Sequence, residues 1–235
     1  MRRKRAVRSA VADCERLAAQ SDHEFGIGLL AGTPTHEGRD PELLSRWAAA
    51  AEEFGSRLAA DDGAAPPERP PRLIETTGGL DPERLLLARY TSRPPAVELF
   101  TDTLAYAEEL IDELDWRHWY PAGSVRAAAL AHETAHCRLH RRTEKAALRQ
   151  ALDHTVLRVG RFRFAGHVAG ADELAAHAYA RAVCGLGRSP LLLTAALAHA
   201  LQSRTAPAHA LQSRTAPAHA LQSRTAPQPV ERREP

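Results

Sequence analysis

The pentad His132-Glu133-Thr134-Ala135-His136 constrains this chain more than any other segment. It has the form HExxH, and on an α-helix positions i and i+4 lie one above the other, so both imidazoles can bind one metal ion. Glu133 lies at the edge of that helix face, where its carboxylate can reach a water molecule on the metal. The spacing predicts a helix that carries a zinc site, with Glu133 as the general base.

The residues before the pentad predict that this helix is buried. Residues 127–131 read AAALA and are apolar around the whole circumference of a helix. Such a helix belongs in a protein interior. We expect it to span residues 125–142, with Ser124 as its N-cap. A buried position suits a metal centre, because a chance match to HExxH would more often fall on a charged surface helix.

A zinc site needs a third protein ligand, and Glu173 is the best candidate. It lies near the start of a predicted alanine-rich helix, residues 171–184, whose small side chains would let it pack closely on the motif helix. An acidic residue in a first helical turn also complements the helix dipole, which is the structural alternative. Asp172 is the competing ligand.

Two other histidines are weaker ligand candidates. His140 continues the stripe of His132 and His136, but eight residues of helix separate the outer two by about 12 Å, too far for one tetrahedral ion. His154 is a more remote alternative, on the next predicted helix.

His177 is the second candidate catalytic residue. It follows Glu173 by four positions and shares its helix face, so it could donate a hydrogen bond to the oxyanion that forms during hydrolysis. A core histidine that is satisfied by a neighbouring group is the alternative. Tyr179 points elsewhere, and we expect it in the core.

Composition indicates an α+β protein that is mostly helical. The chain has 235 residues, of which 44% are hydrophobic and only 5% aromatic, and its net charge of +2 argues against nucleic acid as a partner. No apolar segment follows the basic start MRRKRAVR, and no apolar run reaches membrane-spanning length. Three cysteines without paired spacing (Cys14, Cys137 and Cys184) argue against a disulfide framework and predict a cytoplasmic location.

The chain divides into four predicted parts. We expect a helical N-terminal region (1–60), a proline-rich linker (61–72), a minimal zincin-like metallopeptidase domain (73–187), and a helix end followed by a low-complexity tail (188–235). Three perfect copies of AHALQSRTAP fill much of the last part, and their ten-residue period with proline predicts disorder.

Within these parts the pattern predicts individual elements. In the N-terminal region, Asp40-Pro41 starts a helix that runs to about residue 60, after a glycine-rich break at Gly26, Gly28 and Gly32. The predicted domain contains three strands and further helices. The strands are 72–76, 85–91 and 96–100; the helices are 101–116 and 144–159; residues 161–170 form a loop or at most a short strand.

The two motifs together resemble the ImmA/IrrE type of small gluzincin metallopeptidase. HETAHCRLH followed by the ELAAHAYA run that starts at Glu173 is similar to that family's pattern of HExxHxxLH and then ExxAxxFA. The resemblance covers about residues 95–187. It implies that His132, His136 and Glu173 are zinc ligands and Glu133 the general base. It also implies that strand 96–100 is the sheet edge that pairs with a peptide substrate.

The sequence supports three hypotheses of different classes. The first is a Zn²⁺-dependent peptidase that acts on a peptide or protein substrate. The second is a catalytically weak or inactive zincin-like protein that binds a regulatory partner, which the basic start and the proline-punctuated tail would suit. The third is a di-iron helical bundle, which needs a second ExxH pair that the sequence lacks.

Overall fold

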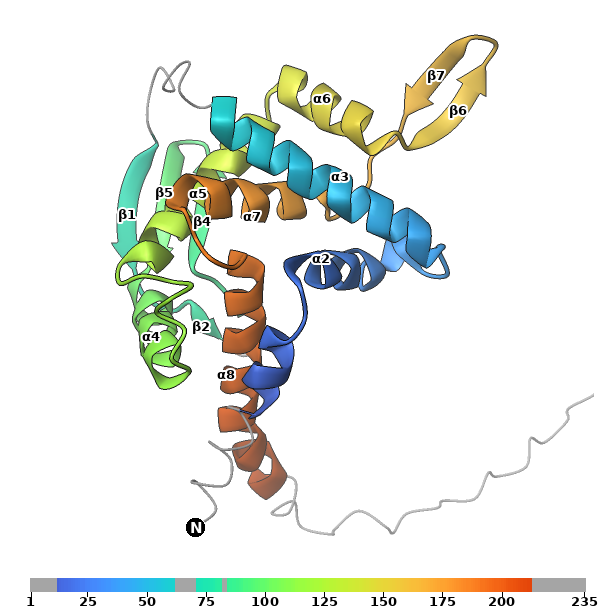
Figure 1. Ribbon diagram of the computed structural model, residues 1–235. Helices are drawn as coiled ribbons and strands as arrows, with labels where there is room; N and C mark the ends of the chain where they lie inside the picture. The colour runs from blue at the N-terminus through green and yellow to red at the C-terminus, as the bar shows by residue number, and fades with distance from the viewer. Residues whose placement is uncertain (1–11, 62–70, 82–83, 213–235) are drawn as a thin grey trace, which may run out of the picture.

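The computed structural model describes residues 12–61, 71–81 and 84–212, and these form a mostly helical structure with one three-stranded sheet and two two-stranded ones (Figure 1). The predicted α+β, mostly helical class is confirmed. The tail from residue 213 onward and most of the proline-rich linker lie outside the described residues. Within the described part, no helix combines the length and the apolar character needed to cross a membrane.

Helices frame the sheet in chain order. After a helical segment at 12–18, the helices are α2 (Asp22–Ala31), the 3₁₀ turn η1 (Pro34–His36), α3 (Pro41–Ala60), α4 (Thr101–Glu113), α5 (Ser124–Leu139), α6 (Arg142–Leu152), α7 (Ala171–Cys184) and α8 (Pro190–Gln212). The strands are β1 (Arg72–Thr76), β2 (Leu80–Asp81), β3 (Arg84–Leu85), β4 (Ala88–Ser92), β5 (Pro95–Phe100), β6 (Thr155–Val159) and β7 (Phe162–Ala165).

The sheet has the order β1-β5-β4, which places β5 in its middle. β5 pairs in parallel with β1 and antiparallel with β4, and its side chains are largely buried. The expectation that strand 96–100 forms the substrate-pairing edge is therefore wrong. Its apolar run, AVELF, is that of a central strand, and β4 is the edge strand next to α5.

The motif helix α5 is buried on both sides, as its composition predicts. Ala131 and Ala135 belong to one apolar cluster, formed with α3, α6 and α7. Val125 and Ala128 belong to a second one, formed with α4 and α8. The predicted cap is wrong: Gly123, with φ 77°, is the N-cap, and Ser124 is already helical.

The chain after α5 differs from the expected single helix over 144–159. α6 ends at Leu152, and Asp153 adopts a left-handed conformation with φ 44°. The next five residues, TVLRV, form β6, which pairs antiparallel with β7 and makes the hairpin that projects from the body in Figure 1. Aspartate tolerates the left-handed conformation, and β-branched residues favour a strand after it.

α2 occupies the stretch where three glycines predicted a break. A capping box starts it: the Ser21 side chain accepts from the Glu24 backbone N–H, and the Glu24 carboxylate accepts from the Ser21 N–H. Gly26 faces α3: a Cβ there would lie 2.7 Å from the Glu52 carboxylate and 3.4 Å from the Ala48 Cβ. Gly26 and Gly28 therefore lie within α2 without interrupting it, and Gly32 is the C-cap at which the helix ends.

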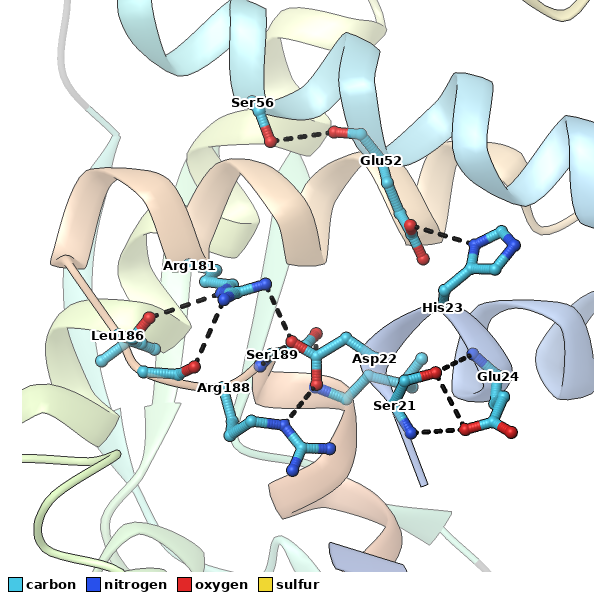
Figure 2. Close-up of polar contacts among 12 residues, drawn as sticks. Ser21, Asp22, His23, Glu24, Glu52, Ser56, Arg181, Leu186, Arg188 and Ser189 are labelled. Atoms are coloured by element: carbon cyan, nitrogen blue, oxygen red, sulfur yellow. Dashed lines mark hydrogen bonds and ion pairs between the residues drawn. The ribbon is translucent and has the colours of Figure 1, made fainter. Parts of the chain in front are cut away.

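Asp22 ties α2 to the segment between α7 and α8 (Figure 2). Its carboxylate lies 2.8 Å from Arg188 Nε and 2.9 Å from Arg181 Nη1, and it accepts from the Ser189 backbone N–H at 2.9 Å. The N-terminal helices are thus joined to the end of α7 by partly buried ion pairs, the class of ion pair that solvent screens least.

α3 and α7 lie side by side along most of their lengths (Figure 1). α3 starts as predicted, with Asp40 accepting from the Glu42 N–H at 3.0 Å and proline in the first turn. Gly55 allows the close approach, because a Cβ there would lie 2.1 Å from the Ala175 carbonyl oxygen. α3 and α7 belong to one core.

α8 reaches into the repeats. Residues 198–207, the first copy of AHALQSRTAP, lie within this helix, and Ala200 in that copy is buried against the second apolar cluster. Helix therefore extends further along the chain than the repeat composition suggested.

Replacing Gly55 with alanine tests the α3–α7 contact. We expect Gly55→Ala to lower the free energy of unfolding by about 2 kcal/mol or more, because the added methyl group overlaps backbone of α7. Gly28→Ala is the matched control: it is also helical, and a Cβ there meets nothing within 4 Å. That control should be neutral or more stable by up to about 1 kcal/mol. Denaturant melts measure both, and equal stability of the two variants would contradict the packing assignment.

Candidate metal centre

Three side chains from two helices converge on one point. His132 and His136 lie one turn apart on α5, and Glu173 lies in the first turn of α7. Each of the two imidazole Nε2 atoms is 3.2 Å from a different carboxylate oxygen of Glu173. The ligand atoms all lie within 4.8 Å of one another, so the group can hold a metal ion.

Small side chains make this convergence possible. Ala135 on α5 and Ala175, Ala176 and Ala180 on α7 are fully buried in one cluster. Gly170, with φ 83°, ends the preceding loop and lets α7 begin directly before its acidic first turn. The alanine-rich run therefore brings the start of α7 onto the HExxH face, as the sequence predicted.

The donor geometry fits a tetrahedral cation better than it fits hydrogen bonding alone. His132 Nε2 and His136 Nε2 are 3.0 Å apart and both face the Glu173 carboxylate. If both nitrogens donate a hydrogen bond to the carboxylate, the two N–H groups lie close together and their positive partial charges repel. Two nitrogens bound to one tetrahedral zinc ion at 2.0–2.1 Å are about 3.3 Å apart, close to the spacing found here. A divalent cation would accept a lone pair from each.

The surroundings favour the metal-binding form of two of the ligands and favour protonation of the third. Burial raises the pKa of the Glu173 carboxyl, but hydrogen bonds from His132, His136 and His177 outweigh it, and the resulting pKa lies far below its usual value. Burial, helped by nearby His177, lowers the pKa of His132, which keeps that ring neutral at pH 7. Burial also acts to lower the pKa of His136, but the Glu173 carboxylate overcomes this and raises it.

Glu133 is held by the sheet and not by the ligand group. Its Oε2 accepts a hydrogen bond from the Tyr90 backbone N–H of β4 at 2.8 Å, and the side chain is only 9% exposed. No sequence pattern points to Tyr90, because the contact comes from a backbone group whose direction depends on strand pairing. One carboxylate oxygen is thus oriented by the edge strand.

A cavity of about 470 Å³ opens over the ligand group and Glu133. Its remaining wall is largely apolar and comes from the β3–β4 segment, the N-terminal half of α5 and the start of α8. Examples from these three walls are Leu86, Val125 and Leu191. Tyr120 also lines this cavity, whereas the neighbouring Trp116 and Trp119 do not.

His177 lies at the ligand group, as expected from its spacing to Glu173. Its Nε2 is 3.2 Å from Glu173 Oε1, its ring centroid is 4.5 Å from that of His132, and it lines the cavity. Whether it serves an oxyanion stays a prediction; its observed contact is with the carboxylate of the third ligand. Tyr179, by contrast, is buried in the core, as expected.

The competing ligand candidates lie outside the group. Asp172 and His140 line a separate, smaller cavity, and His140 is the exposed C-cap of α5. His154 packs edge-on against Trp47, with ring centroids 4.8 Å apart. Across the described ranges there is one three-ligand group, and it offers no second ExxH pair for a di-iron site.

Comparisons with protein families, with curated proteins and with solved structures found no match.

Metal affinity should depend on pH through His136. Binding requires a neutral imidazole, and the raised pKa of His136 means that a proton must leave it. We expect zinc affinity to rise about tenfold per pH unit below that pKa and to level off above it. Competition with a chromophoric chelator at stepped pH measures this. His140→Gln, which removes the outer histidine of the stripe, should keep the same slope, whereas an affinity that does not change with pH would contradict the assignment.

Proposed function

We propose that this protein is a zinc-dependent peptidase of the minimal gluzincin type, in which Glu133 acts as the general base. The observation that carries the proposal is the convergence of His132, His136 and Glu173 beside Glu133 at the floor of one cavity. Two imidazoles and one carboxylate, with space left for water, form a typical catalytic zinc set.

The side chains have separate roles in this proposal. His132, His136 and Glu173 would hold Zn²⁺, which when bound supplies a Lewis acid that polarises a carbonyl group and acidifies water. Glu133 accepts the proton of the attacking water and returns it to the leaving amine. Its Oε2 is fixed by the Tyr90 N–H, which leaves Oε1 as the proton acceptor on the cavity side.

β4 is the proposed binding edge for the substrate. It pairs with β5 along one edge, and Ala88, Arg89 and Tyr90 line the cavity on the other side. A peptide that adds to this edge as an extended strand would run past Glu133 and the ligand group. The apolar cavity wall then favours a hydrophobic side chain next to the scissile bond.

The resemblance to the ImmA/IrrE type supports the same proposal. The motif residues that carry it are the residues that come together here: His132, His136 and Glu173 as ligands, with Glu133 beside them. The sequence motif and the positions of these side chains therefore both support the proposal.

Replacing Glu133 with glutamine separates catalysis from metal binding. We expect Glu133→Gln to lose activity by about 10²–10⁴-fold, because the amide cannot accept the proton, while zinc content stays at one ion per chain. Cleavage is followed by mass spectrometry on a defined peptide library. Glu109→Gln, an exposed change of the same kind on α4, is the control and should keep full activity. Full cleavage by Glu133→Gln would end the proposal.

Removing the third ligand should abolish zinc binding. We expect Glu173→Ala to lose stoichiometric zinc, because two imidazoles alone bind the ion weakly. Asp172→Ala is the matched control, since Asp172 is the neighbouring carboxylate in the same turn of α7 and lies outside the ligand group. Zinc content is measured by inductively coupled plasma mass spectrometry. Loss of zinc from Asp172→Ala alone would reverse the assignment.

A further inference from the structure

A second cavity of about 220 Å³ adjoins the candidate metal centre on the far side of His136. It lies between the C-terminal end of α5, the inner face of α6 and the loop that leads into α7. Among the described residues, His136 alone lines both this cavity and the larger one. The two cavities therefore flank one metal ligand, at successive positions along α5.

Two positive side chains of α6 line one wall of this smaller cavity. Lys145 and Arg149 lie four residues apart on α6 and both line it. Arg149 Nε is buried and makes no hydrogen bond within the described part of the chain. Leu139, Leu148 and Leu152 are buried and form apolar wall. An apolar wall excludes water from the Arg149 guanidinium. With less water around it, the guanidinium attracts an anion more strongly.

The charge balance of the lining is positive. Asp172 supplies the one carboxylate that lines the cavity in the described structure, against the two fixed cations. Lys145 and Arg149 form no ion pair with any carboxylate of residues 12–61, 71–81 and 84–212. Other arginines near the site are paired: Arg141 with Glu144, for example, and Arg181 and Arg188 with Asp22.

We propose that this cavity is a substrate subsite that binds a carboxylate, supplied either by an acidic side chain or by the free C-terminus of a peptide. Arg149 donates to that carboxylate and Lys145 neutralises it. The inference rests on the proposed function and defines its substrate class: an apolar residue in the larger cavity and an anion in the smaller one.

The spacing of the cavities limits where the anion lies on the substrate. Four residues of α5, from His136 to His140, span about 6 Å. An extended peptide advances about 3.3 Å per residue, so the carboxylate lies about two residues from the scissile bond. Because a glutamate side chain can itself bridge part of this distance, the position of the carboxylate can vary by about one residue.

A peptide pair tests the subsite by selectivity. The probes are hexapeptides with one glutamate at each successive position, compared with the same peptides carrying glutamine, in free-acid and C-terminally amidated forms. We expect the glutamate peptide to have a kcat/KM about tenfold above its glutamine partner at one position, if a side chain is the anion. If the C-terminus is the anion, the free acid exceeds the amide by a similar factor.

Charge variants assign that selectivity to the cavity. In Arg149→Gln and in Lys145→Gln the acidic-to-neutral ratio should fall toward one, and Arg149→Lys should keep part of it because it keeps the cation. Arg142→Gln is the matched control, an exposed arginine at the start of α6 outside the cavity lining, and should keep the full ratio. A ratio unchanged in Arg149→Gln and Lys145→Gln overturns the subsite.

Lysine labelling gives a readout that needs no cleavage. Lys145 is one of two lysines in the chain, and the other, Lys4, serves as the internal reference. In zinc-loaded Glu133→Gln protein, the acidic peptide should slow acetylation of Lys145 several-fold relative to Lys4, and its neutral partner should not. Mass spectrometry of the digested protein measures both rates.

The two readouts distinguish the two proposals. Cleavage without acidic preference, and without protection of Lys145, overturns the subsite and leaves the peptidase standing. Protection of Lys145 by the acidic peptide, in a protein whose wild type cleaves no library peptide, supports the subsite and overturns the peptidase. If the assays show no protection of Lys145 and no cleavage, both proposals are overturned.

Discussion

The close approach of α5 and α7 is the constraint on which the rest of the structure depends. Ala135 on α5 and Ala176 and Ala180 on α7 are fully buried in one apolar cluster, and none of them has the side-chain volume that would hold the two helices apart. The Glu173 carboxylate reaches both imidazoles only at this separation. A larger side chain at any of these positions would move the third ligand outward and dismantle the ligand group, even though no ligand had changed. Packing of small residues, more than any polar interaction, therefore sets the geometry of the centre.

The helices and the sheet position different side chains of the site. The helices place the ligands, whereas the edge of the sheet places Glu133 through the backbone N–H of Tyr90. This separation has an electrostatic consequence. Two carboxylates in one buried site repel one another. The three imidazoles offset the charge of Glu173, and the Tyr90 N–H donates a hydrogen bond to Glu133. The two carboxylates therefore have separate sets of partners.

What the sequence could predict follows from the range of each interaction. The shared helix face of His132 and His136 follows from helical periodicity, and the alanine-rich run of α7 favoured the approach of Glu173. The role of Glu133 as a base stays a prediction. The edge strand could not be predicted, because pairing partners depend on segments far apart in the chain. The predicted glycine-rich break is wrong at α2, because the capping box of Ser21 and Glu24 starts a helix there in spite of the glycines. The cationic cavity could not be foreseen, since it exists only where α6 packs beside α5.

The N-terminal helices belong to the support of the metal centre and do not form a separate unit. α7 packs against both α5 and α3, and a Cβ at Gly55 of α3 would lie 2.1 Å from the Ala175 carbonyl oxygen of α7. Asp22 fixes the far end of α7 through Arg181 and Arg188. A chain that began after α3 would expose the apolar face of α7 to water, and the free energy that holds Glu173 in place would be lost with that burial. Detachment of the N-terminal helices would therefore also disturb the position of Glu173.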